Sequence, residues 1–193
     1  VVFFAASLFF TKRRQGRRAS LNEGKSNVKK GVATMNKEEA LEFLRLHQPM
    51  PSEFDDDLDS ETVDAWDAAR EYFTENPCEE AIPLFLGSIG EGYLFGTYQM
   101  LDNFFALFEP DVVVPHLVDA LSSESSWTRR WAAEYASAVE SGRSDLIEAL
   151  LKLLFDPDEE ARTAAVITLK YKFLDGLVNW RDYEATLRSA YAQ

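Results

Sequence analysis

An acidic run in the first half of the chain has residue types that could bind calcium. Its members alternate with other residues: Asp55, Asp57, Asp59 and Glu61. A calcium loop of the EF-hand type starting at Asp55 would need glycine at position 60 and glutamate at position 66. The chain has Ser60 and Trp66 there. We therefore predict no metal site, but a solvated acidic loop over residues 53–61, or alternatively a contact surface for a basic partner.

The histidines and the single cysteine lack the partners that catalysis needs. His116 and Asp119 can share a helix face, but no third group completes a catalytic set. Cys78 follows Pro77 at an expected helix start, where the helix dipole lowers the pKa of a thiol, yet no histidine is near it in the sequence. We predict no catalytic residue and no cofactor. One cysteine also fits a reducing compartment, so we expect a cytoplasmic location.

A glycine-rich segment, GSIGEGYLFG over residues 87–96, could in principle hold a phosphate group. It lacks the Gly-Lys-Ser/Thr ending of a P-loop, and no predicted strand precedes it. We therefore predict a flexible loop between helices. Its aromatic residues Tyr93, Phe95 and Tyr98 are expected in the core, whereas an exposed Tyr93 would suit recognition of a partner.

Tryptophan and arginine residues cluster farther along the chain at Trp127, Arg129, Arg130 and Trp131. Trp127 and Trp131 are four residues apart and share a face of the expected helix, so one of them should be buried. Tryptophan and arginine are also common in binding hot spots. The residues that we predict to contact a protein partner are acidic or aromatic: Asp55, Asp56, Asp57, Asp59, Glu91, Tyr93, Glu124 and Trp127.

The charge of the chain is divided unevenly. Residues 1–34 carry eight Lys or Arg and one acidic residue, whereas residues 35–193 carry 12 Lys or Arg and 32 Asp or Glu. The net charges are therefore +7 and −20. A body with a charge of −20 repels nucleic acid and favours a basic protein partner.

The first 34 residues differ from the rest in composition. Residues 1–10 are apolar and a basic run follows them, but ten residues are too few to span a membrane, and a secretory signal has the opposite order. We interpret residues 1–34 as a disordered or non-native extension, with a tail for nucleic acid or anionic lipid as the alternative. We expect residues 35–193 to form one domain that does not enter a membrane.

Helix signals recur throughout residues 35–193. Asn36 and Glu39 have capping-box spacing, and Pro49 ends the helix that they begin, with His47 near its last carbonyls. A second helix should follow the acidic loop and end at Asn76, and Pro77 should open the next one. Residues 112–114 are better interpreted as a helix start than as a strand, with a proline, Pro115, in the first turn.

Self-comparison reveals a repeat of 33 residues. This offset places Leu117 on Leu150 and Arg129 on Arg162, and a period in this range with two amphipathic helices per unit is typical of solenoids. The predicted units are residues 76–108, 110–140 and 143–173. They follow a divergent helix pair at 36–75 and precede a capping helix at 177–191. The sequence therefore predicts an all-α protein, an α-solenoid of helical hairpins.

The clearest unit, SDLIEALLKLLFDPDEEARTAAVITLKYKF over residues 144–173, resembles a HEAT repeat. Leucines line its first helix and alanines its second, which lets stacked helices approach closely. We expect Asp156 to cap the second helix, with Pro157 in its first position and Glu159 completing the cap. Arg162 stands where HEAT repeats commonly have a basic residue.

The segments FLRLHQPMPSEF and NPCEEAIPLFLGSIGEGY, together with the two clearer repeats, resemble small bacterial HEAT-repeat proteins that act as immunity proteins of contact-dependent or polymorphic toxin systems. The resemblance implies stoichiometric binding of a toxin domain, often a basic nuclease. A general scaffold or adaptor is the alternative, and a HEAT-like lyase or hydroxylase is a third. HEAT-like iron hydroxylases carry His-Glu pairs, and this chain has none. HEAT-like DNA glycosylases have basic concave faces, which the acidic body does not match.

Overall fold

A computed structural model describes residues 35–56 and 58–191, and in this part of the chain every regular element is a helix. The expectation for residues 1–34 lies outside the described residues. The α-helices are α1 (Lys37–Leu46), α2 (Ser60–Glu75), α3 (Ala81–Gly87), α4 (Leu101–Phe105), α5 (Pro110–Ala120), α6 (Ser126–Ala138), α7 (Ser144–Leu153), α8 (Glu159–Leu174) and α9 (Glu184–Tyr191). Short 3-10 helices lie at η2 (Leu94–Gly96), η3 (Tyr98–Met100) and η4 (Trp180–Tyr183).

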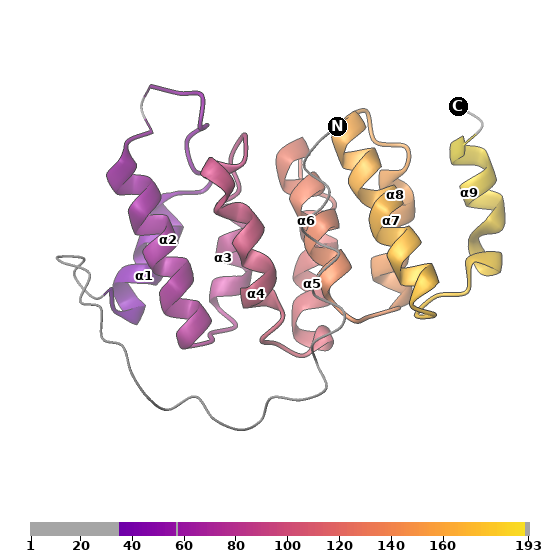
Figure 1. The fold of residues 1–193 in the computed structure, drawn as a ribbon, viewed down its shortest axis with the longest axis horizontal. Helices are drawn as coiled ribbons and strands as arrows, with labels where there is room; N and C mark the ends of the chain where they lie inside the picture. The colour runs from indigo at the N-terminus through magenta and orange to yellow at the C-terminus, as the bar shows by residue number, and fades with distance from the viewer. Residues whose placement is uncertain (1–34, 57, 192–193) are drawn as a thin grey trace. The chain divides into compact units, whose positions relative to one another are not determined.

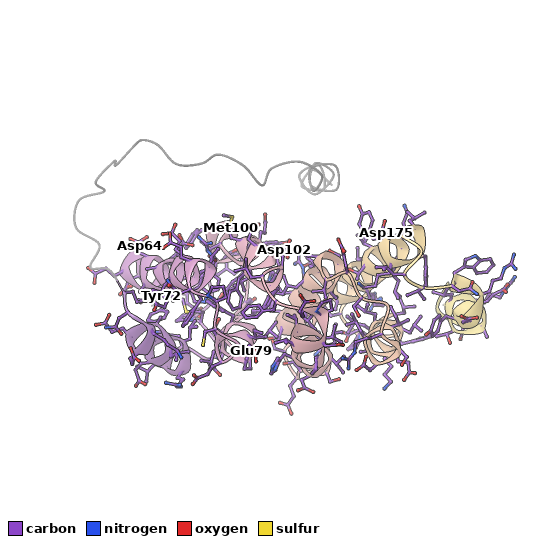
Figure 2. The ribbon with its side chains drawn as sticks, turned by 90° about the horizontal axis from the view of Figure 1, so that it is seen from below. Asp64, Tyr72, Glu79, Met100, Asp102 and Asp175 are labelled. Atoms are coloured by element: carbon purple, nitrogen blue, oxygen red, sulfur yellow. The ribbon has the colours of Figure 1, made fainter. Side chains whose placement is uncertain are left out.

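The helices form two layers that advance together along the chain. Helix α1 contacts α3, α3 contacts α5 and α5 contacts α7, while α2, α4, α6 and α8 contact one another in the same succession. Figure 1 shows the hairpins following one another in sequence order, and Figure 2 shows the layers edge-on, with Asp64, Met100, Asp102 and Asp175 on one side and Glu79 on the other. This arrangement is the predicted α-solenoid.

Alanines make the closest contact in the second layer possible. Helices α6 and α8 contact each other more extensively than any other pair in the described residues. Both bury small side chains, among them Ala132, Ala133, Ala164 and Ala165, which allow two helix backbones to approach. The buried Thr168 hydroxyl donates a hydrogen bond of 2.7 Å to the Ala133 carbonyl of the neighbouring helix. The predicted packing of the repeat is confirmed.

The expected cap of α8 was wrong by two residues. Asp158, not Asp156, is the N-cap, and its carboxylate accepts a hydrogen bond of 2.8 Å from the backbone N–H of Ala161. Glu159 is then the first helical residue, and Pro157 lies outside the helix. Asp156 is engaged elsewhere, because Arg129 donates to both its carboxylate oxygens, at 2.7 and 2.9 Å.

Two arginines 33 residues apart make the same backbone contacts. Arg129 Nη1 donates to the carbonyls of Ser123 and Glu124, six and five residues earlier, at 2.8 and 2.9 Å. Arg162 Nη1 does the same for Asp156 and Pro157, at 2.6 and 3.0 Å. Each arginine therefore closes the turn of its own hairpin, and the repeat seen in the sequence is a repeat of structure.

Prolines and glycines account for the other differences from expectation. Helix α3 begins at Ala81 rather than directly after Pro77. Pro110 occupies the first turn of α5, and Pro115 lies inside that helix. The loop over residues 87–96 is not simply flexible, since it enters two 3-10 turns before the short α4.

A buried lysine makes the stability of the fold depend on pH in the alkaline range. Lys172 is 1% exposed, and its Nζ donates a hydrogen bond of 2.8 Å to the Val139 carbonyl at the end of α6. Burial lowers the pKa of Lys172 to about 8, against an opposing effect of Asp175. The charged form is thus disfavoured in the folded state, so stability is lower below pH 8 and rises as the pH increases from about 8 to 10.5.

We expect the free energy of unfolding to increase by about 3 kcal/mol over that range, since the folded and unfolded pKa values differ by about 2.5 units and one unit is worth about 1.4 kcal/mol. Lys172→Met keeps the aliphatic stem and should abolish the increase. Chemical denaturation at pH 7.5 and 10.5 measures it, with Lys170→Met, an exposed lysine of the same helix, as control. An unchanged pH dependence in Lys172→Met would contradict the assignment.

Candidate partner-binding edge

The turns inside the helical hairpins form one edge of the solenoid. We call residues 47–59, 88–97, 121–125 and 154–158 the hairpin-turn edge. In Figure 1 these turns follow one another along the upper ends of the helices. They contain nine Asp or Glu residues and no Lys or Arg. The turns between hairpins, at residues 76–80, 106–109, 139–143 and 174–179, contain five acidic residues and one arginine. The hairpin-turn edge is therefore the more negative of the two.

The first two turns are joined backbone to backbone. Met50 N–H donates to the Ser88 carbonyl at 3.0 Å, and Glu53 N–H donates to the Glu91 carbonyl at 3.4 Å. A Cβ atom at Gly90 would lie 2.1 Å from the Met50 carbonyl oxygen, so only glycine permits this approach. The Glu53 carboxylate also accepts a hydrogen bond of 3.1 Å from Phe95 N–H.

The second turn is fastened to α6 by an aromatic cluster around one arginine. Tyr93 meets Trp127 and Trp131 edge-on, with ring centroids 6.0 and 5.9 Å away. The guanidinium carbon of Arg130 lies 4.8 to 5.6 Å from the centroids of these three rings, a distance at which cation–π attraction operates. Arg130 also donates to the Tyr93 hydroxyl at 2.9 Å, and the buried Trp131 Nε1 donates to the Gly92 carbonyl at 3.3 Å.

Carboxylates surround the outer side of this cluster. Arg130 forms ion pairs with Glu134 of its own helix and with Glu160 of α8. Asp102 of α4 is half-buried, and neither an ion pair nor a side-chain hydrogen bond reaches its carboxylate from the described residues. Burial raises the pKa of Asp102 to about 7, and the charge of Glu134 adds to the effect. Burial likewise raises the pKa of Glu134, although Arg130 opposes it.

The comparison with known families supports the repeat architecture. Residues 106–176 match the family model for HEAT repeats. Residues 106–176 of the chain are therefore similar to HEAT repeats. The matched range covers α5 to α8, in which the two arginines make equivalent contacts. No curated protein and no solved structure matches the chain.

The hairpin-turn edge contains most of the residues predicted to bind a partner. Four of them are exposed, and their carboxylates contact no other described side chain: Asp55, Asp56, Glu91 and Glu124. Asp59 is exposed too, but its carboxylate caps α2 by accepting a hydrogen bond of 2.7 Å from Thr62 N–H. Asp57 lies outside the described residues. Tyr93 and Trp127 are half-buried and lie in one cluster.

Sequence reasoning misplaced several other residues. Phe95 was expected in the core and is 72% exposed, whereas Tyr98 and Trp131 are buried as expected. Phe54, also 72% exposed, was missed. Cys78 precedes α3 by three residues, so the argument from a helix dipole does not apply to it. His47 does contact a terminal carbonyl, since its Nδ1 lies 2.8 Å from the Phe43 oxygen.

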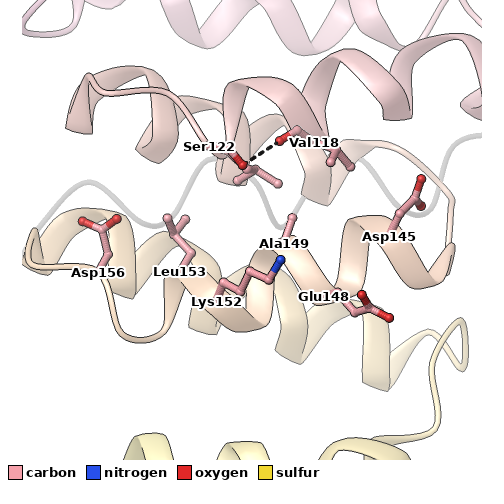
Figure 3. Close-up of a pocket in the computed structure, with 9 residues that line it drawn as sticks. Val118, Ser122, Asp145, Glu148, Ala149, Lys152, Leu153 and Asp156 are labelled. Atoms are coloured by element: carbon pink, nitrogen blue, oxygen red, sulfur yellow. Dashed lines mark hydrogen bonds between the residues drawn. The ribbon is translucent and has the colours of Figure 1, made fainter.

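A groove of about 280 Å³ lies between α5 and α7, in the layer of odd-numbered helices. Figure 3 shows its polar rim, on which Asp145 and Asp156 stand at opposite ends with Glu148 and Lys152 between them. Asp145 is paired with Arg143 and Asp156 with Arg129. The groove does not gather a set of groups that could perform a reaction.

Among residues 35–56 and 58–191, no group of three or more His, Cys, Asp or Glu side chains is arranged to hold a metal ion. Within the same residues, no helix combines the length and the apolar character that crossing a membrane requires.

Proposed function

We propose that this HEAT-like chain binds a basic protein through its hairpin-turn edge, and that it acts as an immunity protein that neutralises a toxin domain by covering it. The observation that carries the proposal is the row of exposed, uncompensated carboxylates on successive turns, from Asp55 through Glu91 to Glu124. HEAT-like repeats generally offer extended surfaces for partner proteins. These turns contain no Lys or Arg that would offset the negative charge of their carboxylates.

The negative charge of the hairpin-turn edge would accelerate the association of this chain with a basic partner. A surface of one sign attracts a partner of the opposite sign over about a Debye length, and the attraction weakens as salt is added. Neutralisation of a toxin before it acts requires rapid binding, which is what steering supplies. The proposal therefore includes action in the cytoplasm, where the toxin is synthesised. The proposed partner is a cationic enzyme domain.

A charge-reversal variant tests the proposal. Asp55→Lys, Glu91→Lys and Glu124→Lys together change one residue in each of three turns and touch no hydrogen-bonded side chain among the described residues. We expect the association rate with the basic protein that copurifies with this chain to fall at least 100-fold at low salt, and protection of cells against that protein to be lost. Surface plasmon resonance at several salt concentrations and a co-expression survival assay measure the two effects.

The matched control changes the same number of charges on the opposite edge. Glu75→Lys, Glu79→Lys and Glu109→Lys replace exposed acidic residues there, and this variant should bind and protect nearly as well as the original chain. Equal losses in both variants would show that only net charge matters and would remove the edge from the proposal. Binding without protection would favour the scaffold or adaptor role.

A further inference from the structure

Two phenylalanines project from the hairpin-turn edge with no share in the core. Phe54 and Phe95 are each 72% exposed. They stand on the first and second turns, which the hydrogen bond between the Glu53 carboxylate and Phe95 N–H joins. A large apolar side chain held in water gains nothing from folding, so these two residues contribute little to the stability of the hairpins that carry them.

The backbone that presents Phe95 is of a kind that side chains disfavour. Leu94 and Phe95 have φ angles of 45° and 52°, between Gly92 at 98° and Gly96 at 89°. Left-handed backbone suits glycine and strains a residue with a Cβ atom. Leu94 is buried, so its packing in the core can compensate for its strained backbone. A loop that served only as a connection would be more stable with glycine at position 95.

Glu53 fixes the direction of Phe95. Its carboxylate accepts the Phe95 N–H, and the same side chain fills the space beside Gly92, where a Cβ atom would lie 2.6 Å from Glu53 Cδ. Acidic residues without a partner in the described part of the chain flank the pair, Asp55 and Asp56 on one turn and Glu91 on the other. An apolar projection thus stands within a negative rim.

We propose that Phe95, with Phe54 on the adjoining turn, is the anchor of the interface, and that it enters an apolar pocket bordered by lysine or arginine on the cationic partner. This inference rests on the proposed function and names the residue that specifies the partner. Charge complementarity selects this occupant, because the rim would repel an acidic surface around the same pocket. Buried aromatic anchors ringed by polar contacts are the usual centre of protein interfaces.

The decisive variant separates binding from folding. Phe95→Gly relieves the strained backbone while removing the anchor, so we expect a melting temperature that does not decrease and an affinity for the partner that is at least tenfold lower. Leu174→Ala is the control, since Leu174 is 70% exposed but lies between hairpins on the opposite edge. Phe95→Tyr, which keeps the ring, should retain most of the affinity.

Photo-crosslinking identifies the partner in the cell that makes this chain. The full chain carries benzoylphenylalanine at position 95, 54 or 174, and adducts are identified by mass spectrometry. We expect adducts with one basic protein from positions 95 and 54 and none from 174, and purified samples of that protein then serve for the affinities above. An unaltered affinity of Phe95→Gly would overturn the anchor and leave the proposed function standing, whereas adducts with a basic protein from 174 alone would overturn both the anchor and the hairpin-turn edge as the binding surface. No adduct with any basic protein would overturn both.

Discussion

Replacing Arg129 with alanine is expected to lower the free energy of unfolding by about 3 kcal/mol, because it leaves the largely buried Asp156 carboxylate without its partner. The pair is bidentate, with N–O distances of 2.7 and 2.9 Å, and it joins the third and fourth hairpin turns. The same arginine satisfies the carbonyls of Ser123 and Glu124. Urea denaturation followed by circular dichroism measures the change.

The repeat supplies the matched control. Arg162→Ala removes the equivalent arginine one repeat later, which binds two carbonyls but no carboxylate, so we expect a loss of only about 1 kcal/mol. Asp156→Asn tests the same pair from its other side. Burial raises the pKa of Asp156, but hydrogen bonds from Arg129 and from Asp158 N–H outweigh it and hold the pKa below its ordinary value. The contribution of Asp156 is thus present near neutral pH and lost in acid. Equal effects of Arg129→Ala and Arg162→Ala would contradict the role of the ion pair.

Asp102→Asn is expected to stabilise the protein at pH 8. The folded-state pKa of Asp102, about 7, lies above its ordinary value of 3.8, so the folded state favours the protonated form. Its contribution to stability is complete below about pH 4 and is lost as the pH rises to about 7. Three units of pKa difference correspond to about 4 kcal/mol. Because the side chain is only half-buried, we expect about half of this, or ~2 kcal/mol.

Denaturation curves at pH 4, 6 and 8 test this expectation. The Asp102→Asn variant should lack the decline that the original chain shows between pH 4 and 7. Asp119→Asn, a change of an exposed acidic residue on α5, is the control and should leave the pH profile unaltered. Parallel profiles for the original chain and Asp102→Asn would refute the assignment.

Local patterns in the sequence predicted the helices. Contacts between residues far apart in the sequence determined details, such as the N-cap of α8, that local patterns could not predict. The leucines and alanines of residues 144–173 have a helical period, so α7 and α8 were foreseeable. Asp156 and Asp158 are equally good caps by type and spacing. Arg129, 27 residues away, decides between them by binding Asp156.

The candidate site was predicted in composition but not in geometry. Acidic residues and Trp127 stand out in the sequence, and the structure places them on neighbouring turns or beside them. Nothing in the sequence marks Leu94 and Phe95 as left-handed, because the flanking glycines are compatible with several turns. The link between Tyr93 and Arg130 spans 37 residues, beyond the reach of any local pattern.

Each hairpin turn is joined to the next, so the junctions between turns follow one another along the solenoid. A pull along the stack loads every junction equally, so the weakest one yields first. Three hydrogen bonds join the first two turns, whereas a bidentate ion pair joins the last two, beside the extensive contact of α6 with α8. Elongation would therefore begin at the N-terminal hairpin. The end of the solenoid that presents Phe54 and Phe95 would be the more deformable one, and it could adapt to the surface of a partner while the C-terminal end keeps its structure.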